Sequence, residues 1–289
     1  MLCFYLPSYP FRGSYAPYLW LYFLILDRMG KEKLTFITGK EYLNSNEEWK
    51  CFAGFFRPEF DDKTQKNMGY SISPKEEWLK HEYRFLSEDI FSTLLKKAGD
   101  DPLKLFKCFL TERIEEFEDE LEAIISDVSA KEKLEGIVTI INSPSLEYIG
   151  KKFNIPIIHI ELGPLRSPQY RKTGYFDFKG VNGNTEAEER FLKDPNDFLN
   201  IDLEIGQLRE FFGLSEDSGT TFLNEYNAGI IMQVDSDSNL IAYGNGFLNI
   251  SLLHWALIQE KWDKVLVRAH PGSYFEAHNL LGRQSDRCS

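Results

Sequence analysis

Four polar residues stand where the chain could do chemistry, each directly after a run rich in apolar and β-branched residues. These residues are Asn142, Glu161, Asp235 and His270. The runs before them have the composition of strands buried on both faces of a parallel sheet. Ligands of such sheets bind beyond the carboxyl ends of the strands. The four residues are therefore the first candidates for catalysis or ligand binding.

Glu161 is followed by Leu162, Gly163 and Pro164, so its carboxylate is expected at a strand end beside a turn. A substrate can reach a side chain in that position, whereas a purely structural glutamate usually lies on a helix face. Such a carboxylate could act as a general acid or base, a role favoured when partial burial raises its pKa. Arg166 follows closely and could either pair with Glu161 or hold an anionic ligand.

Residues 235–239 combine two carboxylates, two hydroxyls and an amide directly after another buried run. Hard oxygen ligands of this kind suit Mg²⁺ or Ca²⁺. Asp235 or Asp237 could equally supply a nucleophile or a base. The structural alternative is an Asx-rich turn that caps the segment after it. The residues alone leave all three interpretations open.

His270 is followed by Pro271 and Gly272, where a helix is expected to begin. A histidine beside the backbone N–H groups of a helix start suits a phosphate group. The alternative is a structural histidine whose hydrogen bonds are satisfied. His159 differs because it lies inside an apolar run, and it is expected to be a core residue.

The first of two β-α-β patterns lies before Glu161. Strands are predicted over 136–141 and 155–160, and a helix over 146–153. Residues 142–145 form a turn and helix N-cap signal between the first strand and the helix. A parallel pair joined by a right-handed crossover is expected.

The second β-α-β pattern lies near the end of the chain. Strands are predicted over 229–234 and 264–269, joined by a long polar loop over 235–249 and a helix over 250–262. The last strand ends directly before His270. This pattern predicts a second Rossmann-like unit over 220–289, expected to be incomplete because the chain ends soon after Pro271.

The first half of the chain supplies the remaining elements. A strand is predicted near 34–38. The most apolar run, 16–26, is much shorter than the ~20 residues of a membrane-spanning helix and predicts a buried helix or strand. Helical spacing with abundant Glu and Lys predicts two or three amphipathic helices over 74–127. We therefore predict an N-terminal α/β domain over 1–185 that carries this helical insertion.

Charge and cysteine usage exclude several classes of protein. A net charge of -12 and a pI near 5.0 argue against a nucleic-acid partner, because phosphate backbones are bound mainly by Lys and Arg. The four cysteines form no CxxC pair, so reduced thiols in the cytoplasm are expected and a structural metal site is not. The first residues also lack the pattern of a signal peptide.

Two motifs resemble those of a known enzyme group. Glu161-Leu162-Gly163 and His270-Pro271 are similar to the acidic-acidic-glycine and His-Pro motifs of bacterial CMP-sugar transferases, with Leu162 at the second acidic position. The strings Glu-Leu-Gly-Pro-Leu-Arg-Ser and Gln-Val-Asp-Ser-Asp-Ser are more similar to the retaining β-Kdo transferases of O-antigen and capsule synthesis. This resemblance covers about residues 135–275.

The resemblance implies a fold, a reaction and substrates. The fold would be two Rossmann-like α/β halves of a modified GT-B glycosyltransferase, truncated at the C-terminus. The enzyme would move Kdo, 3-deoxy-D-manno-octulosonate, from CMP-β-Kdo to a polysaccharide or lipid-linked glycan acceptor. The reaction would retain stereochemistry and need no metal or other cofactor. Its place would be the cytoplasm, at the cytoplasmic face of the inner membrane, with peripheral attachment through other domains or proteins.

The resemblance also implies roles for individual residues. Asp235 or Asp237 would be the nucleophile that forms a covalent Kdo adduct, and Glu161 the acid/base towards the acceptor hydroxyl. His270, with Arg268, would bind the CMP phosphate. The further donor contacts implied are Gln233, Arg166 and Ser167.

Two other functions remain open on the sequence. An inverting CMP-sialic acid transferase would share the donor nucleotide and both motifs, but it would need only a general base. A non-catalytic sugar- or nucleotide-binding module is the second alternative, because Leu162 replaces a motif acid.

Overall fold

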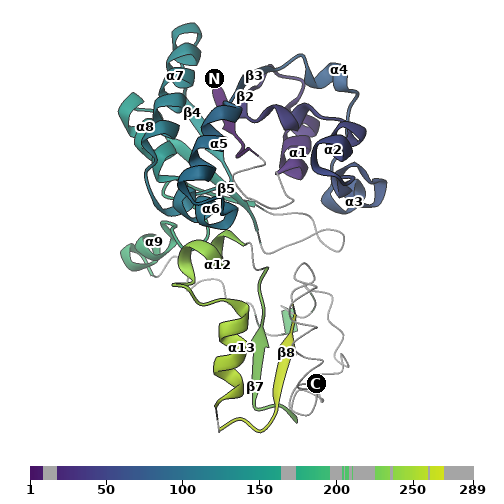
Figure 1. Ribbon diagram of the computed structural model, residues 1–289, viewed down its shortest axis with the longest axis vertical. Coiled ribbons are helices and arrows are strands. Elements are labelled where there is room, and N and C mark those ends of the chain that lie inside the picture. The colour runs from purple at the N-terminus through teal and green to yellow at the C-terminus, as the bar shows by residue number, and fades with distance from the viewer. Residues whose placement is uncertain are drawn as a thin grey trace. The chain divides into compact units, whose positions relative to one another are not determined.

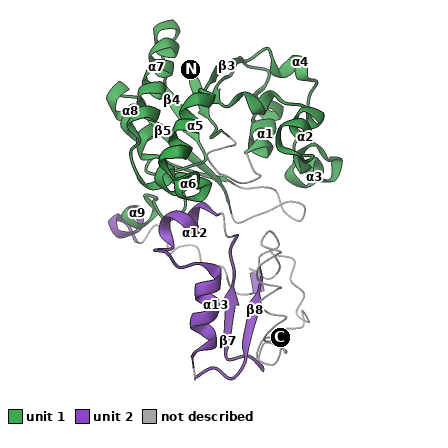
Figure 2. Cartoon of the chain, in the orientation of Figure 1, with its two compact units in different colours: residues 1–189 green, residues 190–289 purple. Residues whose placement is uncertain are grey.

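The computed structural model describes residues 1–8, 18–163, 174–195, 204, 206–207, 210, 225–234, 237–259 and 261–269. The chain forms two compact units, Met1–Glu189 and Arg190–Ser289 (Figure 2). Helix α9 (Ala187–Lys193) runs across the division between them.

Unit 1 is built on a six-stranded sheet in the order β3-β2-β1-β4-β5-β6 among the described residues. The first five strands in this order are parallel, and β6 runs antiparallel to β5. The strands are β1 (Leu2–Tyr5), β2 (Thr35–Thr38), β3 (Glu82–Phe85), β4 (Gly136–Thr139), β5 (Ile157–Leu162) and β6 (Gly174–Asp177). This mixed sheet, flanked by helices, confirms the predicted α/β class.

Helices cover both faces of the sheet (Figure 1). One face carries α1 (Leu19–Met29), α2 (Asn46–Ala53), α3 (Asp62–Met68) and α4 (Lys75–Trp78), with the 3-10 helices η2 (Lys40–Leu43) and η3 (Pro58–Phe60). The other face carries α5 (Glu88–Lys97), α6 (Pro102–Thr111), α7 (Glu115–Lys131) and α8 (Pro144–Phe153).

The aromatic residues of the first half form the core beneath α1. The ring of Tyr22 contacts the rings of Phe36, Tyr42 and Trp78 with centroids 5.3, 5.6 and 6.3 Å apart. Aromatic pairs in these edge-on arrangements add to the stability gained by burial. Residues 19–26 of the apolar run at 16–26 therefore lie in a buried helix, one of the two structures predicted for the run. In the part of the chain that the structure describes, no helix has the length and apolar character needed to cross a membrane.

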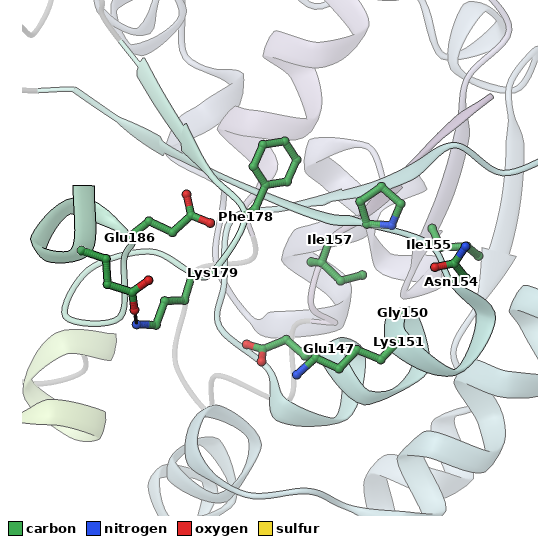
Figure 3. A pocket seen from close by; sticks show the side chains of 11 residues that line it. Glu147, Gly150, Lys151, Asn154, Ile155, Ile157, Phe178, Lys179 and Glu186 are labelled. Carbon is green, nitrogen blue, oxygen red and sulfur yellow. Dashed lines mark hydrogen bonds and ion pairs between the residues drawn. The ribbon is translucent and has the colours of Figure 1, made fainter. Parts of the chain in front are cut away.

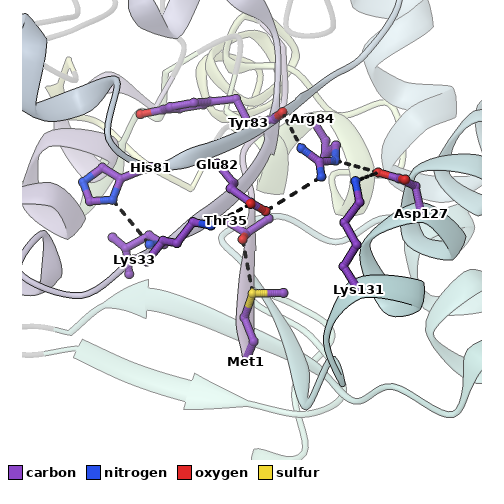
Figure 4. A network of polar contacts seen from close by, with 10 residues as sticks. Met1, Lys33, Thr35, His81, Glu82, Tyr83, Arg84, Asp127 and Lys131 are labelled. Carbon is purple, nitrogen blue, oxygen red and sulfur yellow. Dashed lines mark hydrogen bonds and ion pairs between the residues drawn. The ribbon is translucent and has the colours of Figure 1, made fainter.

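The segment over 74–127 is richer in structure than predicted. It holds the four helices α4, α5, α6 and most of α7, where two or three were expected, and also β3. β3 lies at one edge of the sheet, and its charged side chains form a polar network (Figure 4). Lys33 pairs with Glu82 at 2.8 Å, and Arg84 pairs with Asp127 at 3.0 Å. Charged side chains on an edge strand oppose pairing with other chains.

The first β-α-β pattern is confirmed as β4, α8 and β5. β4 and β5 pair in parallel, with Val138 opposite Ile158. The helix begins at the predicted signal, because the Ser143 side chain accepts a hydrogen bond from the backbone N–H of Leu146. It ends at Asn154, which adopts a left-handed conformation with φ of 54°.

Unit 2 confirms the second β-α-β pattern. β7 (Ala228–Ile231) and β8 (Val265–Arg268) pair in parallel, and α13 (Asn249–Leu257) packs on β7. The prediction of a long polar loop over 235–249 is wrong for residues 238–243, because α12 (Ser238–Tyr243) forms there. A small core holds these elements together, made by Ile230, Met232, Leu253, Ala256 and Val265.

Candidate functional site

The parallel strands of unit 1 all end at one edge of the sheet, called here the carboxyl edge. β1 lies in the middle, with β2 on one side and β4 on the other. β2 and β3 follow β1 on one side, and β4 and β5 follow on the other side, so the strand order reverses between β1 and β4. Open α/β sheets bind ligands beyond the carboxyl ends at such a switch point. The carboxyl edge is the first place to look for a site.

Glu161 lies near the carboxyl end of β5, in register with Tyr175 of β6. Its Oε1 atom accepts a hydrogen bond from the backbone N–H of Leu162 at 2.6 Å. The side chain is partly buried and lines a cavity of about 340 Å³. The predicted position at a strand end is confirmed.

The wall of this cavity is mostly apolar. Trp20, Leu21 and Leu24 of α1 line one side, and Ile140 and Leu162 belong to the strand side. A carboxylate that opens into such a cavity can exchange a proton with a bound hydroxyl group while bulk water is partly excluded. Leu162, which stands at the second acidic motif position, adds to the apolar wall.

Asn142, at the end of β4, has a structural role in place of the predicted chemical one. The side chain is buried. Its Nδ2 atom donates to the backbone oxygen of Val181 at 2.8 Å, and its Oδ1 atom accepts from the Val181 N–H at 2.8 Å. These two hydrogen bonds hold the segment after β6 against the end of β4.

His159 is fully buried in β5, which confirms the prediction of a core histidine. Within the described part of the chain, neither ring nitrogen has a hydrogen-bond partner. Burial lowers the pKa of His159, an effect that Asp177 opposes. The ring is therefore neutral at neutral pH.

We expect acidification to destabilise the chain through this buried ring. The unfolded state takes up a proton near the ordinary histidine pKa of about 6.5, whereas the folded state resists protonation to lower pH. The free energy of unfolding should thus fall below about pH 6.5, by up to ~1.4 kcal/mol per pH unit. Urea denaturation between about pH 7.5 and pH 5.5 measures the slope. His159→Leu should flatten it, with the exposed His254→Leu as matched control, and an equal slope in both variants would contradict the assignment.

In unit 2, Gln233 follows β7 and makes hydrogen bonds to nearby residues. The backbone of Gln233 makes two hydrogen bonds to the side chain of Asn249 at the start of α13. The Gln233 N–H donates to Asn249 Oδ1 at 3.0 Å, and the Gln233 backbone oxygen accepts from Asn249 Nδ2 at 2.6 Å. Its own Oε1 accepts from the Val234 N–H at 3.1 Å.

Asp237 is the N-cap of α12. Its Oδ1 atom accepts a hydrogen bond from the backbone N–H of Asn239 at 2.8 Å. This contact supports the capping interpretation for Asp237, one of the three left open by the sequence. Of the two aspartates proposed as nucleophile, one therefore has a structural function.

Arg268 is the last residue of β8, and its side chain is exposed. The carbonyl oxygen of Arg268 accepts a hydrogen bond from the N–H of Met232 at 3.0 Å, which continues the pairing of the two strands. Four predicted site residues lie outside the described residues, namely Arg166, Ser167, Asp235 and His270.

A second cavity, of about 490 Å³, lies at the amino end of β5 (Figure 3). Glu147 and Lys151 of α8 line it together with Lys179. Burial raises the pKa of Glu147, an effect that Lys151 opposes. This cavity is remote from the carboxyl edge, so it contains none of the predicted catalytic residues. Among the described residues, no group of three or more His, Cys, Asp and Glu side chains could hold a metal ion.

The fold and the cavity at its carboxyl edge define an α/β protein of the Rossmann-like kind found in glycosyltransferases. The profile of the glycosyltransferase 99 family N-terminal domain matches residues 4–186, well over half of the chain. The chain belongs to the glycosyltransferase 99 family, and the predicted glycosyltransferase class is confirmed. A comparison with curated proteins finds no match.

Proposed function

We propose that the chain transfers Kdo from CMP-β-Kdo to a polysaccharide or lipid-linked glycan acceptor, with retention of configuration. The observation that carries this proposal is the family match over residues 4–186, which includes Glu161 and its motif string. The choice of CMP-β-Kdo as donor rests on the resemblance of three motifs to those of CMP-sugar and β-Kdo transferases. These motifs are the strings that begin at Glu161 and Gln233, and His270-Pro271.

Asp235 is the proposed nucleophile, because Asp237 already caps α12. The anomeric carbon of Kdo is quaternary and bears a carboxylate, and the adjacent carbon has no hydroxyl. Its transition state therefore resembles a tertiary oxocarbenium ion, which a nearby carboxylate can stabilise or capture.

The proposed reaction has two displacements. In the first, a carboxylate oxygen of Asp235 bonds to the anomeric carbon, and the bond to CMP breaks with its electron pair leaving on the phosphate. In the second, the acceptor hydroxyl oxygen bonds to the same carbon and Asp235 leaves as a carboxylate. The hydroxyl proton passes to Glu161, whose carboxylate opens into a cavity at the carboxyl edge.

The proposed donor contacts are the residues that the motif strings imply. His270 and Arg268 hold the CMP phosphate and stabilise its departure. Gln233, Arg166 and Ser167 complete the donor contacts. CMP leaves as a stable phosphate monoester, so this scheme requires neither metal nor cofactor.

The proposed place of the reaction is the cytoplasm, at the inner membrane. Cys3, Cys51 and Cys108 are free thiols, as is usual for proteins of a reducing compartment.

Donor choice separates this proposal from its first rival. We expect the chain, incubated with CMP-Kdo or CMP-sialic acid and a mixture of bacterial glycan acceptors, to consume CMP-Kdo at least about 10-fold faster, which corresponds to ~1.4 kcal/mol of transition-state discrimination. Mass spectrometry of released CMP and of the glycan measures both rates. Preference for CMP-sialic acid would favour the inverting sialic acid transferase. Binding of CMP without turnover of either donor would favour a non-catalytic module.

A further inference from the structure

A third cavity, of about 340 Å³, lies at the carboxyl edge of unit 1 beside β1, β2 and β3. Each of the three strands is followed by residues that line it, namely Ser8 after β1, Gly39 and Glu41 after β2, and Ser87 after β3. Its volume lies within the roughly 300–1,000 Å³ of small-molecule sites. The cavity thus occupies the part of the sheet where α/β proteins bind ligands.

Ser8 offers a hydroxyl group that the described protein does not use. The residue is 8% exposed and lines the cavity. Its Oγ atom has no hydrogen-bond partner among the described residues. An unpaired buried hydroxyl opposes folding, so such a group commonly pairs with an ordered water molecule or with a bound ligand. In Ser8 the group borders a cavity large enough for a ligand.

Glu41 adds a carboxylate to the same cavity. It is only 8% exposed. Gly39 leaves the space for this carboxylate, because a Cβ atom at position 39 would collide with it. Lys40 and Glu88 also line the cavity and form an ion pair, with Nζ and Oε1 3.7 Å apart. The polar lining thus combines the carboxylates of Glu41 and Glu88, serine hydroxyls, the amide of Asn44 and the paired Lys40. It disfavours a phosphate or another anion, because the carboxylates outnumber the single cation.

Aromatic side chains supply the apolar part of the lining. Phe52 of α2 and Phe91 of α5 both border the cavity. A sugar ring presents C–H groups on its faces and hydroxyl groups around its edge. Aromatic rings match the faces, and carboxylate and hydroxyl oxygens match the edge.

We propose that this cavity binds one neutral sugar unit of the glycan acceptor, through Ser8 and Glu41. The proposal rests on the proposed function, since it assigns the acceptor to the same sheet edge that carries Glu161. Because CMP is anionic, the cavity should not bind the donor nucleotide.

Three variants test the cavity. Ser92→Trp should fill it from the rim, because Ser92 is an exposed residue of α5 that lines it. Thr93→Trp is the matched control, since Thr93 is exposed on the same helix and is not among the lining residues. Ser8→Ala removes the unpaired hydroxyl, so the melting temperature should stay equal or rise while sugar binding weakens by about fivefold, the value of one hydrogen bond.

The probes are the methyl glycosides of D-glucose, D-galactose and N-acetyl-D-glucosamine, titrated against the full chain by saturation-transfer NMR. We expect at least one to bind, Ser92→Trp to weaken it by more than about 10-fold and Thr93→Trp to leave it unchanged. Equal effects of the two tryptophans, displacement of the glycoside by CMP, or a lower melting temperature of Ser8→Ala with unchanged binding would overturn the proposal.

The outcomes also separate this inference from the proposed function. A chain that consumes CMP-Kdo but binds none of the glycosides overturns the sugar subsite alone. If the chain binds a glycoside and Ser92→Trp weakens that binding, but the chain consumes no CMP-Kdo, the subsite is supported and the proposed donor is contradicted.

Discussion

Asp235→Asn should reduce Kdo transfer by at least about 10³-fold, equivalent to some 4 kcal/mol of activation free energy. The amide has nearly the size of the carboxylate but cannot attack the anomeric carbon. Asp237→Asn should keep most of the activity, because asparagine caps a helix about as well as aspartate. Initial rates of CMP release in the presence of acceptor measure both variants.

Asp237→Ala supplies the stability control for this pair. Loss of the hydrogen bond to the Asn239 N–H should lower the free energy of unfolding by about 1 kcal/mol. Asp235→Asn should leave the melting temperature unchanged. If Asp237→Asn were inactive and Asp235→Asn active, the nucleophile would be Asp237 and the cap would have to open during the reaction.

Glu161→Gln should lower transfer by roughly 10²–10⁴-fold, the usual contribution of a general acid or base. Glutamine preserves the size of the side chain and can still accept from the Leu162 N–H, so the local structure should persist. The loss should appear in kcat more than in KM for the donor, because the proton is transferred only as the acceptor reacts.

Glu147→Gln is the matched control for Glu161→Gln. Glu147 is also a carboxylate that lines a cavity, but it lies on α8 at the amino end of β5. Its replacement should leave transfer unchanged. Equal losses of transfer activity in the two variants would show that Glu161 affects activity only through protein stability or net charge. A fully active Glu161→Gln variant would exclude Glu161 as the acid/base.

The β-α-β patterns were predictable because their signals are local. The run at 136–141 is apolar and β-branched, and Ser143-Pro144 marks the helix start that the structure shows. The strand predicted over 264–269 is likewise present as β8, Val265–Arg268. In these segments the buried strand and its helix are specified by neighbouring residues.

β2 lies within the run predicted near 34–38, whereas β1, β3 and β6 depend on tertiary contacts that a sequence pattern does not contain. β3 has the sequence Glu-Tyr-Arg-Phe, where charged residues alternate with aromatic ones because the strand lies at the sheet edge. β1 is only four residues long and gains its stability from pairing on both sides, with β2 and β4. β6 pairs antiparallel with β5, which no crossover rule predicts.

The candidate site was predictable only in part. The position of Glu161 follows from the strand that ends there, and the structure adds the cavity that makes it accessible. For Asn142 and Asp237 the sequence could not distinguish a reacting side chain from one that bonds to backbone, because that depends on Val181 and on the unexpected α12. The cavity beside Ser8 was missed because residues from three separate strand ends form it.

The central claim is tested most directly by the mass of the intact protein after mixing with CMP-Kdo in the absence of acceptor. We expect a species heavier by one Kdo, located at Asp235 by peptide mapping, absent in Asp235→Asn and lost when acceptor is added. CMP-sialic acid should give no adduct. Transfer of Kdo that proceeds without any adduct, and with inversion of the anomeric configuration, would contradict the account and indicate direct displacement.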